Sequence, residues 1–272
     1  MTIHTEPTAV TLARGVQHHV ALVTDDGEMT YGEIHERVQA RRAELGSTRR
    51  LVMIETAITV EPIITYLAAL EAGHPVVLLE QASTLTGATV QSRNELLVSR
   101  FDPDVIAMAA DGEWVLDERR AGTRHELHPD LALLATTSGS TGSPKVVRLS
   151  KNNLLSNAFA ISEYLALDIA DRAMTTLPLH YCYGLSVLNS HLVAGASVRL
   201  NSRSVIDPQL WNDFDAAQAT SFAGVPHTFE LLEQSDFATR DLSSLRYVTQ
   251  AGGRLDPARA RRFIHLGHVW TN

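Results

Sequence analysis

Residues 131–150 read LALLATTSGSTGSPKVVRLS, and no other stretch of the chain carries as strong a signal. The apolar runs 131–136 and 146–149 predict two strands, and residues 136–141 between them supply five hydroxyl side chains. Gly139 and Gly142 allow neighbouring backbone N–H groups to point into one concavity, which suits an anion. The hydroxyls add hydrogen-bond donors and Lys145 adds a positive charge. The segment is therefore a candidate polyphosphate-binding loop.

This loop differs from the P-loop of nucleotide hydrolases. A P-loop has four residues between its glycines and places Gly-Lys-Ser/Thr at the start of a helix. Here two residues separate Gly139 from Gly142, and Pro144 precedes Lys145. Proline favours an extended residue before it, and the valines that follow favour a strand. The loop is thus expected to join two strands without help from a helix dipole. On composition alone, the segment is equally compatible with a plain hydroxyl-rich hairpin.

On both sides of the loop, short apolar runs alternate with helical segments. The expected helices are 30–45, 61–72, 94–100, 150–165, 185–193, 208–218 and 257–266. The expected strands, besides the two that flank the loop, are 51–54, 75–79, 105–109, 174–177, 197–200, 221–225, 245–249 and 268–271. Such alternation is typical of parallel sheets with helices on both faces. The sequence therefore predicts an α/β fold with mainly parallel sheets covered by helices on both faces.

Two regions bear on the domain organisation of the 272-residue chain. Residues 110–129 are charged and contain glycine, which predicts either a linker between sub-structures 1–110 and 129–272 or a surface hairpin at Asp111-Gly112. The chain ends on the expected strand 268–271, and an α/β domain rarely ends at the strand edge where ligands bind. We therefore expect residues 1–272 to be a fragment of a larger domain.

Composition excludes several classes of protein. The net charge is −8, which argues against broad binding to nucleic acids. A single cysteine, Cys182, excludes a disulfide scaffold and a cysteine-rich zinc site. The longest apolar tract, 51–70, contains Glu55 and Glu61, so no membrane insertion is expected. Residues 1–10 show no signal peptide, and the expected location is the cytoplasm.

Residues 137–145, TSGSTGSPK, resemble the phosphate-binding signature of the adenylate-forming superfamily. This superfamily includes acyl-CoA synthetases, aryl-CoA ligases, luciferases and peptide-synthetase adenylation domains. Further segments resemble the family in order and spacing: 29–33 (MTYGE), 177–184 (LPLHYCYG), 224–226 (GVP) and 250–255 (QAGGRL). The likeness runs from about residue 30 to the end of the chain. It implies the family's layered αβαβα large N-terminal domain, incomplete because the chain stops before the YGxTE motif.

The resemblance implies an enzyme that activates a carboxylic acid with ATP. An acyl-adenylate and pyrophosphate form, and the acyl group then passes to the thiol of CoA or of an acyl or peptidyl carrier protein, the chemistry of acid–thiol ligases (EC 6.2.1). Lys145 would be the catalytic residue beside the phosphates. The implied nucleotide-binding residues are Thr137, Ser138, Gly139, Ser140, Thr141 and Gly142 around the phosphates, and Gly252 and Gly253 beside adenine. Positioning and charge neutralisation would supply most of the catalysis.

The chain also departs from the family pattern. The glutamate that binds Mg²⁺, the ribose-binding aspartate and the C-terminal domain with its lysine would all lie beyond residue 272. The fragment alone is therefore not expected to complete adenylation. Gln250 stands where the family commonly has serine, and Arg254 where it often has proline. A non-catalytic nucleotide- or partner-binding module that retains the fold is the alternative interpretation, and an unrelated α/β phosphate-binding protein is a third.

The substrate pocket is expected around residues 180–184. The family's amino-acid-activating members place an aspartate in this motif, and its absence here favours a plain acyl or aryl acid. The implied pocket residues are His180, Tyr181, Gly184, His227 and Ala251, with Tyr183 as a further candidate. Packing at a strand-to-helix turn is the alternative role for these side chains. No metal-ligand set is expected, because the histidine pairs lack a third ligand at a known spacing.

Overall fold

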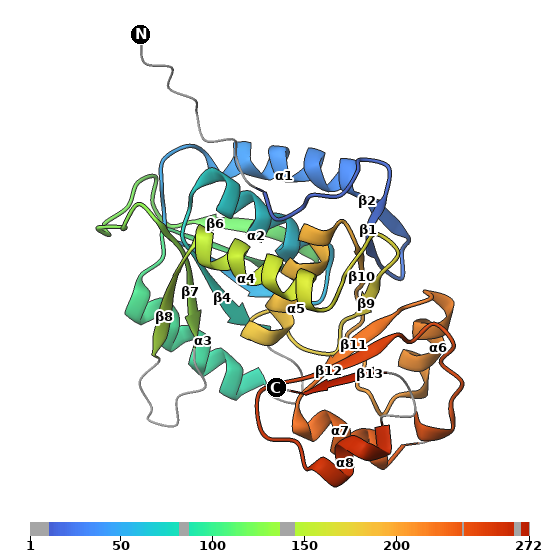
Figure 1. Cartoon of the computed structure of the whole chain (residues 1–272). Helices are drawn as coiled ribbons and strands as arrows, with labels where there is room; N and C mark the ends of the chain where they lie inside the picture. Colours follow the sequence, from blue (N-terminus) through green and yellow to red (C-terminus); the bar gives the residue numbers. More distant parts are fainter. Residues whose placement is uncertain (1–10, 82–86, 137–144, 236, 264–267, 272) are drawn as a thin grey trace. The chain divides into compact units, whose positions relative to one another are not determined.

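The computed structural model describes residues 11–81, 87–136, 145–235, 237–263 and 268–271 (Figure 1). The chain forms two compact units, each built on its own mainly parallel sheet. Unit 1 comprises Met1–Arg14 and Gly32–Ser156, and unit 2 comprises Gly15–Tyr31 and Asn157–Asn272. None of the helices in the described ranges has the length and apolar character that a membrane crossing requires.

Unit 1 contains a six-stranded sheet in the order β6-β5-β3-β4-β7-β8. The four inner strands run parallel, and β6 and β8 pair antiparallel at the two edges. The strands are β3 Val52–Thr56, β4 Val76–Glu80, β5 Val105–Ala110, β6 Glu113–Glu118, β7 Leu131–Thr136 and β8 Val146–Ser150. Strands β5 and β6 form a hairpin through Asp111 and Gly112, which confirms the hairpin expected there.

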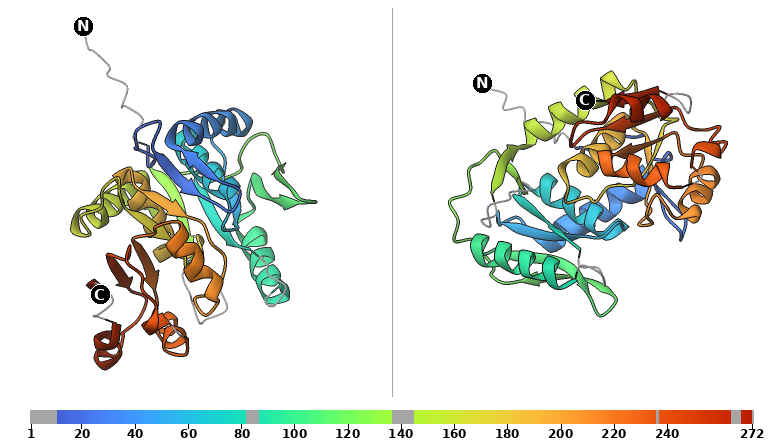
Figure 2. Two further views of the ribbon diagram at one scale, coloured as in Figure 1. Left: turned by 90° about the vertical axis from the view of Figure 1, so that its right-hand side faces the viewer. Right: turned by 90° about the horizontal axis from the view of Figure 1, so that it is seen from below.

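Helices cover both faces of the unit 1 sheet (Figure 2). They are α1 Tyr31–Leu45, α2 Val60–Ala72, α3 Gly87–Phe101 and the first part of α4 Lys151–Tyr164. Helix α2 is apolar nearly all round, and it is buried from Pro62 to Leu70 as such a pattern requires. Helix α3 packs through Leu97 against Met53 and Leu79 on another part of the core.

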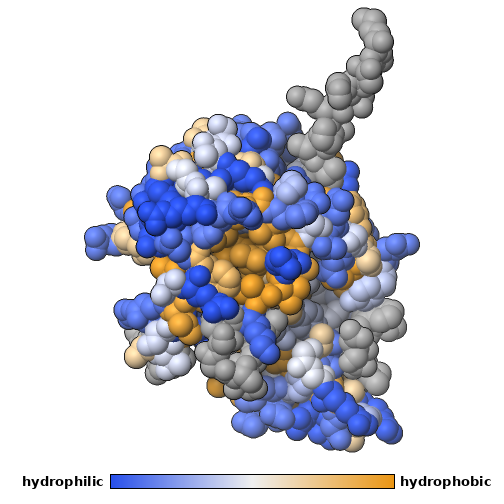
Figure 3. Space-filling model, turned by 90° about the vertical axis from the view of Figure 1, so that its left-hand side faces the viewer, coloured by the Kyte–Doolittle hydropathy of each residue, from blue (hydrophilic) through white to orange (hydrophobic). Residues whose placement is uncertain are grey.

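Several apolar side chains that pack against this core of unit 1 are only half-buried. Among them are Leu131 and Val146, while Val147 on the edge strand β8 is 48% exposed. Figure 3 looks onto the side that carries β7 and β8 in Figure 1, and apolar side chains gather there in one area bordered by polar ones.

Unit 2 contains a seven-stranded sheet in the order β13-β12-β11-β9-β10-β1-β2. All neighbouring strands are parallel except β1 and β2, which form an antiparallel hairpin. The strands are β1 Val20–Val23, β2 Glu28–Thr30, β9 Arg172–Met174, β10 Ser197–Arg199, β11 Ser221–Gly224, β12 Tyr247–Gln250 and β13 His268–Thr271.

Different helices cover the two faces of the unit 2 sheet. They are α5 Cys182–Ala194, α6 Pro208–Ala216, α7 Pro226–Glu233, the short 3₁₀ helix η1 Phe237–Thr239 and α8 Pro257–Phe263. On one face Trp211, Phe214, Phe229 and Phe263 pack with Phe222 of β11 in an aromatic core. On the other face lie α5 and the end of α4, and this face carries the candidate site.

Most expected elements are present, and the α/β fold with mainly parallel sheets is confirmed. Helix α2 ends at Gly73, as predicted, and Ser150 caps α4 through a hydrogen bond from the Asn153 N–H to its Oγ (3.1 Å). Strands β1 and β2 were not predicted, and α3 is longer than expected. The division into sub-structures 1–110 and 129–272 stays a prediction.

Candidate functional site

The hydroxyl-rich segment connects two neighbouring antiparallel strands of unit 1. Thr136 at the end of β7 pairs with Val146 at the start of β8, so the chain between them reverses direction as the sequence predicts. Thr137, Ser138, Gly139, Ser140, Thr141 and Gly142 lie outside the described residues. Lys145 directly precedes β8 and is exposed. The structure therefore places the two ends of the loop.

The motif 177–184 in unit 2 forms the entry into helix α5. Tyr181 is the residue before the helix, and its N–H donates a hydrogen bond to the Pro178 carbonyl (3.2 Å). Gly184 is buried, and a Cβ there would lie 2.9 Å from the Leu177 carbonyl oxygen and closer still to that of Pro178. The first turn of α5 can approach this backbone so closely because residue 184 has no side chain.

The motif 250–255 in unit 2 forms a turn after β12, and Gln250 holds it. The Gln250 side chain is 2% exposed, and its Nε2 donates to the carbonyls of Ala251 (3.0 Å) and Gly253 (2.8 Å). The Ala251 N–H donates to the carbonyl of Gly224 on the neighbouring strand (3.3 Å). The departure from serine at position 250 thus has a structural role, since the longer amide shapes the turn.

Gly252 brings the two motifs of unit 2 into contact. Its φ of +81° is favoured by glycine, and a Cβ there would lie 2.5 Å from the Tyr181 hydroxyl oxygen. Burial raises the pKa of the Tyr181 phenol. The residues at the start of α5 and those after β12 therefore meet at one place on the sheet, although 71 positions separate Tyr181 from Gly252 in the sequence.

The remaining predicted pocket residues have different surroundings. His180 is half-buried and Ala251 is partly exposed. Gly253 is exposed, and a Cβ there would meet the ring of Pro226 at 3.2 Å. His227 lies in the first turn of α7 with its side chain 71% exposed, and its Nδ1 is 3.1 Å from Glu230 Oε2. Of these, His227 has the surroundings of a surface residue.

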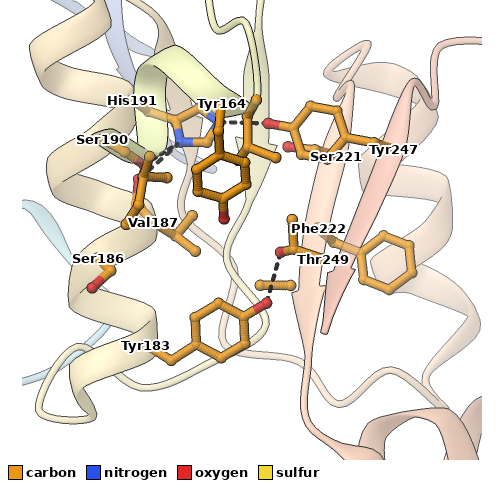
Figure 4. Close-up of a pocket in the computed structure, with 13 residues that line it drawn as sticks. Tyr164, Tyr183, Ser186, Val187, Ser190, His191, Ser221, Phe222, Tyr247 and Thr249 are labelled. Atoms are coloured by element: carbon orange, nitrogen blue, oxygen red, sulfur yellow. Dashed lines mark hydrogen bonds between the residues drawn. The ribbon is translucent and has the colours of Figure 1, made fainter. Parts of the chain in front are cut away.

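A small cavity of about 30 Å³ lies next to the junction of the two motifs, enough for about two water molecules. Helices α4 and α5 form one side of it, and strands β11 and β12 form the other (Figure 4). Tyr183 of the first motif and Thr249, directly before the second, both line it. The other lining residues are Ile161, Tyr164, Leu165, Ser186, Val187, Ser190, His191, Ser221, Phe222, Ala223 and Tyr247.

Strand and helix periodicity explain which side chains face this cavity. Ser221 pairs with Tyr247 and Ala223 with Thr249 in the parallel register of β11 and β12. The alternate Phe222 belongs to the aromatic core, and its ring points away from the cavity in Figure 4. On α5 the facing residues follow a spacing of four, from Tyr183 through Val187 to His191.

Hydrogen bonds fix the polar groups around the cavity. The Tyr183 hydroxyl donates to Thr249 Oγ1 at 2.7 Å, which ties α5 to β12. His191 is 2% exposed; its Nδ1 lies 2.8 Å from the Val187 carbonyl and its Nε2 lies 3.5 Å from the Tyr247 hydroxyl. Burial lowers the pKa of the His191 imidazole and raises the pKa of Tyr247 to about 12. All these groups are therefore neutral at physiological pH.

From the sequence, Tyr183 was a predicted pocket residue, whereas Tyr164, His191, Ser221, Tyr247 and Thr249 were not. A signal for some of them was present, because Ser221, Tyr247 and Thr249 are polar positions in strands that also carry apolar residues. Among the residues that the structure describes, no three histidine, cysteine, aspartate or glutamate side chains are placed to hold a metal ion.

Comparison with known proteins supports the same family. Residues 11–270 match the family model of the AMP-binding enzymes. The chain is 31% identical over 159 residues to an oxalate–CoA ligase of Arabidopsis thaliana (57% of this chain), and 27% identical over 277 residues to a component of the linear gramicidin synthase of Brevibacillus parabrevis (90% of this chain). The fold matches that of ATP-bound MatB from Rhodopseudomonas palustris with a TM-score of 0.75 at 24% identity, over 92% of this chain.

The chain spans 30% of the oxalate–CoA ligase, 3% of the gramicidin synthase component and 55% of the MatB chain. The family match itself covers almost the whole of the present chain, and the motifs and the two-sheet α/β fold agree with it. The chain belongs to the AMP-binding, adenylate-forming enzyme family and corresponds to the family's large N-terminal domain.

Proposed function

We propose that the chain carries the ATP- and acid-binding part of a ligase that converts a carboxylic acid into an acyl-adenylate. In this reaction a carboxylate oxygen attacks the α-phosphorus of ATP, the bond to the β-phosphate oxygen breaks, and pyrophosphate leaves. The acyl group then passes to the thiol of CoA or of a carrier protein. One observation carries the proposal: Tyr181 and Gly252 join the two motifs beside a cavity lined by Tyr183 and Thr249.

Each part of the chain has a role in this proposal. Residues 137–142 would surround the β and γ phosphates, and Lys145 would neutralise charge there. Gly252 and Gly253 would allow adenine to approach the backbone, while the 180–184 segment would direct the acid toward the α-phosphorus. Mg²⁺ would arrive with ATP.

The nature of the cavity favours a plain acyl or aryl acid over an α-amino acid. No carboxylate lines it among the described residues, so a substrate ammonium group would have no ion-pair partner there. A cytoplasmic location stays a prediction.

The test is pyrophosphate release by the complete protein with Mg-ATP and a panel of acids. We expect Lys145→Ala to lower the rate at least 100-fold without changing the unfolding transition, because an exposed lysine before a strand contributes little to a core. Arg148→Ala is the matched control, because Arg148 is an exposed cation on the same strand, β8. Equal rates for the two variants would contradict the role given to Lys145.

Amide hydrogen exchange gives a second test that does not need turnover. Millimolar Mg-ATP should slow exchange in residues 138–145 of the complete protein, because phosphate oxygens would accept hydrogen bonds from this backbone. If exchange there is unchanged while the rest of the protein is folded, the phosphate-binding role is wrong. Protection without pyrophosphate release for any acid would instead favour the non-catalytic module.

A further inference from the structure

We propose that Gln250 is a positioning residue for the nucleotide: its side-chain amide turns the backbone N–H groups of Gly252 and Arg254 outward, where they donate hydrogen bonds to the adenosine part of ATP. This inference rests on the proposed function, which brings adenine to the glycine turn after β12. It gives a role in the reaction to the glutamine that stands where the family commonly has serine.

The turn after β12 has a buried side and an exposed side. Gln250 is the last residue of β12, in register with Gly224 of β11, and it is 2% exposed. The next residues along the turn, Gly252, Gly253 and Arg254, are all exposed. The Gln250 amide therefore occupies the buried side of the turn, and the other side is open to a ligand.

Two hydrogen bonds from one amide fix the direction of two peptide groups. Gln250 Nε2 donates to the carbonyls of Ala251 (3.0 Å) and Gly253 (2.8 Å), so both oxygens point toward the buried amide. The peptide bonds of the turn are trans, and in a trans peptide the C=O and the N–H that follows it point in opposite directions. The N–H groups of Gly252 and Arg254 therefore point away from Gln250, toward the exposed side.

These two N–H groups are available to a ligand. Within the described part of the chain, the Ala251 N–H donates to the Gly224 carbonyl, whereas the N–H groups of Gly252 and Arg254 make no hydrogen bond. Gly252 has a φ of +81°, and a left-handed residue of this kind lets neighbouring N–H groups converge on one acceptor. Because the carbonyls of Ala251 and Gly253 face inward, the turn offers donors and no acceptors from these peptide groups.

Packing alone does not explain the presence of an amide at position 250. The Gln250 Oε1 atom is buried, and it has no hydrogen-bond partner among the described residues. A buried acceptor without a partner lowers stability, and an apolar side chain of similar length would avoid that loss. The two carbonyls of the turn therefore set the orientation of the amide, as expected if the shape of the turn is what this side chain provides.

Outward N–H donors suit the uncharged acceptor atoms of a nucleoside. The ring nitrogens N3 and N7 of adenine accept hydrogen bonds, and neutral backbone donors can pair with them without an added charge. The phosphates have a separate place in the proposed function, at residues 137–142 and Lys145. Gln250 should therefore affect the binding of the adenosine part and leave the binding of the phosphates unchanged.

Two probes separate these parts in the complete protein with Mg²⁺. ATP carries adenosine and phosphates, and inorganic tripolyphosphate carries phosphates alone. We expect Gln250→Ser to raise the Kd of ATP at least 10-fold and to leave the Kd of tripolyphosphate within 2-fold of the wild-type value, as measured by calorimetry. An unchanged Kd for ATP, or an equal loss for both probes, would overturn the inference.

The matched control is Gln218→Ser at the end of α6. The Gln218 amide also donates to a backbone carbonyl, that of Asp215 (2.8 Å), but its side chain is exposed. This variant should bind ATP like the wild type. If Gln218→Ser weakens ATP binding as much as Gln250→Ser does, the effect does not come from the turn after β12 and the inference fails.

Kinetics distinguish positioning from a merely structural role. In pyrophosphate release with benzoate, or with the fastest acid of the panel, Gln250→Ser should raise KM for ATP at least 10-fold and leave KM for the acid within 2-fold. Gln250→Glu keeps the length of the side chain but can donate at most one hydrogen bond, so it should also raise KM for ATP. A lower kcat at unchanged KM for ATP is the result of partial unfolding, and it would overturn the inference.

Hydrogen exchange in the wild-type protein needs no substitution and decides the matter if the variants do not fold. AMP should slow exchange in residues 251–255, and tripolyphosphate should not, because only AMP carries adenosine. The inference fails if AMP gives no protection there, or if tripolyphosphate protects the segment equally. Protection by AMP without pyrophosphate release for any acid would leave the role of the turn in place and contradict the proposed function.

Discussion

Each unit of the molecule contains a buried histidine, and the two have different partners. In unit 1 His74 is 1% exposed; its Nδ1 accepts the Arg50 N–H (3.1 Å) and its Nε2 lies 3.1 Å from the Gly46 carbonyl. In unit 2 His191 has one backbone partner, and its other nitrogen faces a tyrosine side chain at 3.5 Å. Burial lowers the pKa of both rings. A shifted pKa therefore does not distinguish a structural histidine from one at a candidate binding site.

Cavity size does not distinguish these two kinds of histidine either. The hollow beside His74 measures about 310 Å³, ten times the volume of the one beside His191. The larger hollow is lined by polar and charged side chains such as Lys151 and Asp130, and none of the family's motifs borders it. Two motifs meet beside the smaller one. The convergence of motifs and the kind of hydrogen-bond partner therefore mark the site better than burial, pKa or volume.

The structural role of the polar residues near His74 can be tested at Asp104. Asp104 is fully buried and accepts hydrogen bonds from the Leu51 N–H (2.8 Å) and the Arg120 guanidinium (3.1 Å). Asp104→Ala leaves buried donors without an acceptor and should lower the free energy of unfolding by about 3 kcal/mol. Urea denaturation measures this, with Asp130→Ala as the exposed control. A loss below about 1 kcal/mol would show that these groups do not hold unit 1 together.

The approach of α5 to residues 177–178 can be tested at Gly184. In Gly184→Ala the new methyl group would overlap the backbone carbonyls of Leu177 and Pro178, so we expect a loss of about 2 kcal/mol. Gly122→Ala is the matched control, because a Cβ at Gly122 meets nothing within 4 Å. Thermal unfolding of both variants measures the difference. Equal transition temperatures would mean that α5 can shift without cost, and the close packing would not be required.

Local signals in the sequence predicted much of the fold. Pro62 and Gly73 delimit α2, and the prediction of 61–72 agrees with the observed Val60–Ala72. The hairpin of β1 and β2 was overlooked although Asp26-Gly27 lies between the two strands, a strong hairpin signal. Unit 2 gathers its sheet from both ends of its sequence, since β1 pairs with β10. Local pattern does not encode such a pairing.

The candidate site was only partly predictable, for the same reason. Resemblance identified the motif containing Tyr183, and the spacing of four residues places His191 on the same face of α5. Which strands lie opposite that face depends on the parallel register of β11 and β12, and 26 positions separate Ser221 from its partner Tyr247 in the sequence. Tertiary pairing, and not composition, therefore brings the polar wall together.

Replacing each buried histidine with leucine tests the difference between the two units. His74→Leu leaves a buried donor and a buried acceptor unpaired and should cost about 2 kcal/mol. His191→Leu should cost about 1 kcal/mol, because the Val187 carbonyl retains the Ser190 hydroxyl as a donor at 3.1 Å. Denaturant unfolding measures both losses, and kcat/KM with benzoate should fall further in His191→Leu. If His74→Leu impairs the reaction more than it impairs stability, the assignment of roles is reversed.

The pKa shifts of the two buried histidines predict how the stability of the fold depends on pH. Both pKa values are lowered in the fold, so the unfolded chain binds more protons below about pH 6.5. Stability should be constant above that pH and fall as the pH decreases, by at most about 1.4 kcal/mol per pH unit for each histidine. Denaturation at pH 5.5 and 7.5 measures the fall. Each leucine variant should lose part of this dependence, and an unchanged dependence in both would contradict the prediction.

The smallest effect on stability is expected at His227, which serves as the exposed reference for the two buried rings. Its side chain is 71% exposed and pairs with Glu230, which also pairs with Arg259. Exposed ion pairs of this kind contribute little, so His227→Ala should unfold like the wild type. Pyrophosphate release by this variant then tests a role in acid binding directly, because folding no longer complicates the result. A fall in kcat/KM would place α7 at the acid site, and an unchanged value would restrict the site to α4, α5, β11 and β12.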